Sequence, residues 1–145
     1  MPTRSEFDNA YMEMAVTWSK LSKAKRKKVG CIVVNEKTII SDGYNGMPSG
    51  FDNECEHLTN SGGVGVMKTR PEVLHAESNA ITKLAKSTRS SEGATLYITL
   101  SPCIECAKLI IQSGIKRVVY KEPYRDTTGL ALLEKGGVVA DRLWY

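Results

Sequence analysis

The chain has 145 residues, of which 41% are hydrophobic and 25% charged, and its net charge at pH 7 is +4. This composition is typical of a globular protein and predicts a single domain over residues 1–145. It argues against a membrane protein, because no apolar run approaches the roughly 20 residues that a membrane span requires. The N-terminus does not resemble a secretory signal, so we expect a cytoplasmic location. There the four cysteines would be thiols or metal ligands rather than disulfides.

The first predicted element is an amphipathic helix over about residues 5–21. Ser5 is expected to cap this helix, with Asp8 at the acidic position of a capping box. Its apolar side chains recur at spacings of three and four and form one stripe: Phe7, Ala10, Tyr11, Met14, Trp18 and Leu21.

A basic run follows this helix and consists of Lys23, Lys25, Arg26, Lys27 and Lys28. Such a run could contact nucleic acid or the phosphates of a nucleotide. It could equally be a solvated basic loop. Composition alone does not separate these alternatives.

A β-hairpin is predicted next, with strands over residues 29–34 and 38–41. Cys31 lies in the first strand and is expected to be a small buried hydrophobe. From Asp42 to about Pro71 no regular period is visible, and the stretch contains the block GYNGMPSG at residues 43–50. Long stretches of this kind are usually functional. Glycine backbone can also approach a ligand closely and present its N–H groups to anions.

The second half alternates between helices and strands. Apolar spacing predicts a helix directly after His75, a strand over residues 95–100, and a helix that ends at Gly114. Ser101 is expected to be the N-cap of that helix, with Pro102 at its first position. A strand over residues 116–120 and a helix ending at residues 136–137 follow. This order predicts parallel pairing through right-handed crossovers, and hence an α/β fold whose mixed sheet of about five strands carries helices on both faces.

Two short motifs carry the chemistry: His75-Ala76-Glu77, and Pro102 through Cys106 with the order PCIEC. Together they match the H-x-E…P-C-x-x-C signature of zinc-dependent nucleobase deaminases. We expect His75, Cys103 and Cys106 to bind zinc, because catalytic zinc takes three protein ligands and leaves one position open. The two cysteines share one face of a helical first turn, where the helix dipole favours thiolates. Of the two histidines, His57 and His75, only His75 is followed at the second position by a carboxylate.

Glu77 is predicted to be the catalytic acid and base. Zinc activates a water molecule for attack, and Glu77 would deliver the water proton to a ring nitrogen and later protonate the departing amine. Each fragment has a simpler interpretation when taken alone. A Cys-x-x-Cys pair can be buried or redox-active, and a glutamate can stabilise a helix N-terminus. A zinc-stabilised binding module is a further alternative, although a structural site would close with four protein ligands.

The chain resembles the deoxycytidylate (dCMP) deaminases of the phage and eukaryotic type, which belong to the zinc-dependent cytidine deaminase superfamily. The resemblance extends from Lys28 to about Gly137. It is carried by five segments: residues 43–50 (GYNGMPSG), 75–81 (HAESNAI), 100–108 (LSPCIECAK), 112–116 (QSGIK) and 124–126 (YRD).

The resemblance implies hydrolytic deamination of dCMP to dUMP and ammonia, which feeds dTMP synthesis. It implies a three-layer α-β-α sandwich of the cytidine deaminase type, assembled as a homohexamer. It also implies activation by dCTP and inhibition by dTTP, with Mg²⁺ accompanying the effector triphosphate.

A rival prediction is a deaminase of free nucleosides, tRNA or single-stranded nucleic acid. Nucleic-acid editors use extended aromatic surfaces for stacking, and the aromatic content here is only 7%.

The resemblance further implies two sets of nucleotide-binding residues. Asn45 would hold the sugar, and the remaining substrate contacts would come from Arg26, Ala76, Ser101, Pro102 and Tyr124. The effector contacts would come from Lys28, Gly43, Tyr44, Asn45, Gly46 and Gly50.

Some phage relatives hold a second, structural zinc between the two motifs. Cys55 and His57 could be remnants of such a site, with Cys31 as a distant candidate, but no four-ligand set is visible.

Overall fold

The computed structural model describes residues 1–61 and 64–144. In chain order the elements are α1 (Arg4–Ser19), β1 (Gly30–Asn35), β2 (Thr38–Tyr44), β3 (Glu56–Ser61), β4 (Val64–Thr69), α2 (Ala76–Ala85), β5 (Thr95–Leu100), α3 (Ile104–Gln112), β6 (Arg117–Glu122), α4 (Thr128–Lys135) and β7 (Val139–Arg142). Within the described residues, no helix is both long enough and apolar enough to cross a lipid bilayer.

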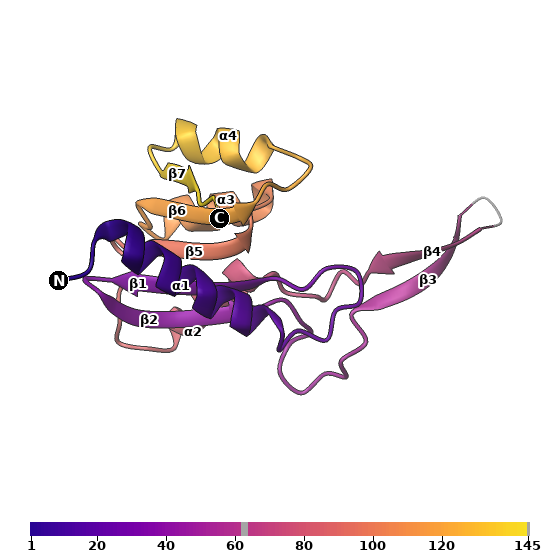
Figure 1. Ribbon diagram of the computed structural model, residues 1–145. Helices are drawn as coiled ribbons and strands as arrows, with labels where there is room; N and C mark the ends of the chain where they lie inside the picture. Colours follow the sequence, from indigo (N-terminus) through magenta and orange to yellow (C-terminus); the bar gives the residue numbers. More distant parts are fainter. Residues whose placement is uncertain (62–63, 145) are drawn as a thin grey trace.

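The main sheet has five strands in the order β2-β1-β5-β6-β7 (Figure 1). Strands β2, β1 and β5 pair antiparallel, whereas β5, β6 and β7 pair parallel. The predicted mixed sheet and the predicted parallel crossovers in the second half are therefore confirmed. The predicted hairpin is also present, and its turn places Glu36 and Lys37 at positive φ.

Two hydrophobic clusters lie on opposite faces of this sheet and define three layers. Alternate residues of β1 supply both clusters, because successive side chains of a strand point to opposite faces. Cys31 and Val33 pack with α2, α3 and α4, whereas Ile32 and Val34 pack with α1. The predicted α-β-α sandwich is confirmed. Cys31 is fully buried, as the sequence predicts.

Helix α1 begins earlier than predicted and presents a different face to the sheet. Its N-cap is Thr3, whose hydroxyl and backbone form a capping box with Glu6, so the prediction of Ser5 and Asp8 for these roles is wrong. The predicted apolar stripe is also partly wrong, because Met14 and Leu21 are 42% and 47% exposed. The buried positions of α1 are Asp8, Tyr11, Met12 and Ala15, of which only Tyr11 belongs to the predicted stripe.

An ion pair between α1 and β6 accounts for this rotation. Arg117 donates two hydrogen bonds to Asp8, with N···O distances of 2.9 and 2.8 Å, and a third to Asp141 at 2.9 Å. The Tyr97 hydroxyl also donates to Asp8 at 2.6 Å. A buried carboxylate needs such partners. The face of α1 that carries Asp8 therefore packs on the sheet, and part of the predicted apolar stripe is left exposed. Burial raises the pKa of Asp8, but the hydrogen bonds of Arg117 and Tyr97 and the charge of Arg117 outweigh it, so the pKa is lowered.

Replacing Arg117 with methionine is expected to lower the free energy of unfolding at pH 7 by about 3 kcal/mol, because it leaves the Asp8 carboxylate buried without its cation. The measurement is urea denaturation. Asp8 titrates at lower pH when folded than when unfolded, so the ion pair stabilises the protein above about pH 4 and this contribution is lost as the pH falls through the folded pKa. The difference between wild type and variant should therefore shrink below about pH 4.

The exposed Lys108–Glu105 pair provides the control for this prediction. Lys108→Met should change the free energy of unfolding by less than about 1 kcal/mol, as is usual for surface pairs. A loss at Arg117 as small as the loss at Lys108 would contradict the role of the buried pair.

Strands β3 and β4 form a two-stranded arm that extends away from the sheet (Figure 1). The stretch from Asp42 to about Pro71, in which no regular period is visible, therefore contains strands in two places, because β2 also continues to Tyr44. The described side chains of the arm belong to neither hydrophobic cluster, and Leu58 is 70% exposed. Strands that pack on neither hydrophobic cluster need no alternating apolar pattern, and this explains why periodicity does not reveal the arm.

Candidate active site

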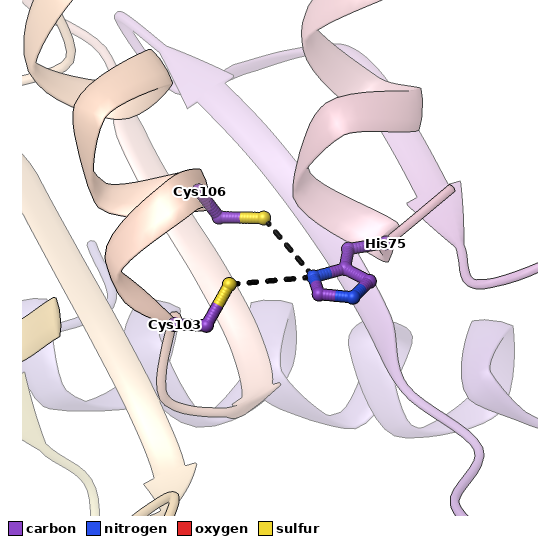
Figure 2. Close-up of side chains that lie close together, drawn as sticks. All are labelled: His75, Cys103 and Cys106. Atoms are coloured by element: carbon purple, nitrogen blue, oxygen red, sulfur yellow. Dashed lines mark hydrogen bonds between the residues drawn. The ribbon is translucent and has the colours of Figure 1, made fainter. Parts of the chain in front are cut away.

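Three potential metal ligands converge where the N-termini of α2 and α3 meet (Figure 2). His75 is the N-cap of α2, Cys103 is the N-cap of α3, and Cys106 lies in the first turn of α3. His75 Nδ1 lies 3.5 Å from the sulfur of Cys103 and 3.3 Å from that of Cys106. Throughout residues 1–61 and 64–144, no other group of three or more His, Cys, Asp or Glu side chains is gathered in this way. The structure thus brings together the three predicted ligands.

The hydrogen bond between the two cysteines shifts the pKa values of their thiols in opposite directions. Hydrogen bonds from Cys106 and His75 lower the pKa of Cys103 to about 3, so Cys103 is the thiolate. The same hydrogen bond to Cys103, together with burial, raises the pKa of Cys106. The hydrogen bond to Cys103 also raises the pKa of His75. A thiol that coordinates zinc loses its proton. A bound zinc ion would therefore displace the proton held between the two cysteines, and both sulfurs and the imidazole could be its ligands. The donor set fits zinc.

Glu77 lies in the first turn of α2, two residues after His75, and is not part of the ligand cluster. The residue is only 4% exposed. Burial raises the pKa of Glu77 to about 7, against the opposing effects of its own backbone N–H and of the charge on His75. A carboxylate of this kind can both accept and donate a proton near neutral pH, as a general acid and base must.

The start of α3 differs from the prediction by two residues. The N-cap is Cys103 and not Ser101, and the first helical residue is Ile104 rather than Pro102. The hydroxyl of Ser101 instead accepts a hydrogen bond from the backbone N–H of Tyr124 at 2.6 Å, and the backbone N–H of Ser101 donates to the carbonyl of Glu122. Ser101 therefore ties the end of β5 to the segment that follows β6. The shift leaves Cys103 and Cys106 on the same helical turn.

A cavity of about 240 Å³ opens in front of the ligand cluster and Glu77. Five of the six predicted substrate-binding residues line it: Arg26, Asn45, Ala76, Ser101 and Tyr124. The sixth, Pro102, is fully buried in the protein and is not part of the cavity wall. The amide of Asn45 is already engaged, since it accepts a hydrogen bond from the N–H of Val29 and donates one to the carbonyl of Lys27.

The predicted effector residues other than Asn45 lie outside this cavity. Gly43 packs against α2, and a Cβ at this position would lie 2.3 Å from the carbonyl oxygen of Ala76. Gly46 forms an isolated antiparallel bridge with Leu74. Lys28, Tyr44 and Gly50 are exposed. The role of these residues as an effector site stays a prediction.

Eight further residues of the cavity wall were not predicted to belong to this site, among them Lys27, Cys55 and Glu56. Lys27 forms an ion pair of 2.8 Å with Glu122, whereas Arg26 has no side-chain hydrogen bond or ion pair within the described part of the chain. A second zinc gains no support, because no cluster of three ligands surrounds Cys55 and His57 in the described residues. Cys31 lies in the core and donates its S–H to the carbonyl of Ala76.

The family model of the cytidine and deoxycytidylate deaminase zinc-binding region matches residues 5–122. The chain belongs to this family. The predicted family is therefore confirmed, and the two motifs of the site both lie within the matched residues.

Individual deaminases of the family cover the chain to different extents. The deoxycytidylate deaminase of Mus musculus is 38% identical over 135 residues, which are 90% of this chain and 75% of that protein. The deoxycytidylate deaminase of Schizosaccharomyces pombe is 35% identical over 140 residues, which are 93% of this chain. The chain spans only 43% of that yeast protein.

A crystal structure from the same family closely matches the fold. It is the dCMP deaminase of the cyanophage S-TIM5, solved in complex with dCMP and dUMP. The two structures superimpose with a TM-score of 0.88 and 43% sequence identity, covering 98% of this chain and all of the phage chain.

Proposed function

We propose that this deaminase family member is a zinc-dependent dCMP deaminase, which hydrolyses dCMP to dUMP and ammonia and so feeds dTMP synthesis. One observation carries the proposal: the ligand cluster, the buried Glu77 and the cationic Arg26 share a single cavity. The first two provide the means of deamination, and the third provides a site for a phosphate. The cyanophage relative crystallised with dCMP and dUMP supports the same substrate.

The catalytic roles follow from the positions of the residues. Zinc, held by His75 Nδ1 and the sulfurs of Cys103 and Cys106, would supply an activated water as nucleophile. Glu77 is buried beside this cluster, so its carboxylate would accept the proton that the water loses and deliver it to the ring nitrogen. The carboxylate would then accept the proton of the hydroxyl group newly bound to the reacting carbon and donate it to the amine, which departs as ammonia. The apolar wall formed by Ala76 and Leu100 would exclude other water molecules from the reacting carbon.

Substrate recognition would come from the other side of the cavity. Arg26 would bind the 5′-phosphate, because its guanidinium can donate two parallel hydrogen bonds to phosphate oxygens. Asn45 retains one free amide hydrogen for the sugar after its two backbone contacts. Ser101 would keep Tyr124 near the nucleotide through its hydrogen bond to the Tyr124 backbone.

We also propose the features that rest on the family resemblance. These are a homohexamer in the cytoplasm, activation by dCTP and inhibition by dTTP, with Mg²⁺ bound to the effector triphosphate. Repeating the dCMP assay with dCTP or dTTP and Mg²⁺ tests the regulation. A rate that responds to neither nucleotide would exclude it.

Ammonia release from dCMP, deoxycytidine, CMP and a cytosine-containing oligonucleotide, measured side by side, tests the proposed substrate. We expect kcat/KM for dCMP to exceed that for deoxycytidine by about 10- to 100-fold, because a charge-assisted hydrogen bond contributes about 1.5–3 kcal/mol. A preference for deoxycytidine would contradict the role of Arg26. A preference for the oligonucleotide would favour a nucleic-acid deaminase instead.

A further inference from the structure

Glu56 is a buried acid in the wall of the cavity that we propose to receive a phosphate. Glu56 is only 6% exposed, and it lines the cavity together with Arg26 and Lys27. A carboxylate near a phosphate raises the energy of the complex through charge repulsion. Its presence therefore needs a compensating role.

The hydrogen bonds of Glu56 indicate what this role is. One carboxylate oxygen accepts the backbone N–H of Lys25 at 2.8 Å and that of Arg26 at 2.9 Å. The other oxygen accepts the same Lys25 N–H at 3.1 Å. Successive backbone N–H groups that point at one anion form a strong and geometrically defined site. The acid therefore binds the main chain of the basic run and leaves the side chain of Arg26 free.

Asn45 holds the same segment from its other end. Its amide donates to the Lys27 carbonyl at 2.8 Å and accepts the Val29 N–H at 2.9 Å. Residues 25–29 are thus fastened at both ends, although the segment belongs to no helix or strand. Without these bonds, a segment this rich in like charges would repel itself and gain conformational freedom.

We infer that Glu56 is a positioning residue for phosphate recognition, an inference that rests on the proposed function. It fixes the backbone of Lys25 and Arg26 so that the guanidinium of Arg26 faces the substrate phosphate. Glu56 is the first residue of β3, opposite Thr69 at the base of the arm. The Arg70 N–H donates to the carbonyl of the preceding residue, Cys55, at 2.7 Å. The base of the arm is therefore the fixed point from which Glu56 reaches the basic run.

Kinetics of Glu56→Ala on dCMP and deoxycytidine test this role. We expect KM for dCMP to rise by about tenfold or more, with kcat within about twofold, because the phosphate partner is misplaced while the reacting groups are not. Deoxycytidine lacks the phosphate, so its kcat/KM should stay within about twofold of wild type. Arg26→Ala should reproduce this pattern. Glu54→Gln, an exposed acid two residues earlier, should leave both substrates unchanged.

Two kinetic results would overturn the inference. A lower KM for dCMP in Glu56→Ala would show that the carboxylate acts mainly by repelling the phosphate. An equal loss on dCMP and deoxycytidine would show a general structural role. If Glu56→Ala does not fold, Glu56→Gln gives the same comparison, with a smaller rise in KM for dCMP because one side-chain oxygen remains to accept the backbone N–H groups.

Amide hydrogen exchange of the zinc-loaded protein provides a readout that is independent of turnover. The Lys25 and Arg26 amides should exchange at least about tenfold faster in Glu56→Ala than in wild type, and at the wild-type rate in Glu54→Gln. Unchanged exchange in Glu56→Ala would contradict the inference. If wild type releases no ammonia from dCMP, the proposed function fails, while the exchange rates still decide whether Glu56 holds this segment.

Discussion

Replacing Glu77 with glutamine is expected to lower kcat for dCMP by about 10²- to 10⁴-fold while the protein keeps its zinc. The amide preserves the size of the side chain but cannot accept the proton that the attacking water must lose. Because Glu77 is not part of the ligand cluster, the metal should remain bound. Steady-state ammonia release together with zinc analysis by atomic absorption measures both effects.

Glu105→Gln is the matched control, since it removes an acid of the same kind from the exposed side of the α3 first turn. It should retain wild-type turnover. A Glu77→Gln protein with normal kcat would end the assignment of Glu77 as proton carrier, and one without zinc would make Glu77 a part of the metal site.

Replacing Cys103 with alanine should remove both the zinc and the activity, because two protein ligands do not hold a catalytic zinc as three do. A group that binds only the native state stabilises it, so a chelator should lower the Tm of wild type. The same chelator should leave the Tm of Cys103→Ala unchanged. This thermal measurement reports on the metal without relying on turnover.

Cys31→Ala separates loss of a ligand from loss of a buried thiol. Cys31 is fully buried in the core and lies outside the ligand cluster, so its replacement should cost stability yet leave zinc content and the chelator effect intact. Normal zinc content in Cys103→Ala would show that the ligand assignment is wrong.

The parts of the fold and site that follow from short-range patterns could be predicted. Strand β5 was expected over its observed residues, and His75 was expected just before α2. Local spacing also placed Cys103 and Cys106 on one helical turn. In each case the deciding interaction joins residues only a few positions apart, so it is visible in the order of the residues.

The parts that could not be predicted depend on partners distant in sequence. The rotation of α1 is set by Asp8 and Arg117, which are 109 positions apart. Glu56 reaches the backbone of Lys25 across 31 positions, and Ser101 reaches Tyr124 across 23. A carboxylate or hydroxyl on its own does not reveal which distant N–H group it will accept, so neither helix rotation nor these contacts follow from local periodicity.

The outer part of the arm formed by β3 and β4 should tolerate inserted residues better than its base. Its described side chains contribute to neither hydrophobic cluster, so extra residues in the outer part would not require the core to repack. Its base is different, because Glu56 there binds the basic run beside the cavity. A fluorescent or affinity module is therefore best inserted beyond Leu58 on β3 and before Met67 on β4, where the added mass leaves the cavity undisturbed.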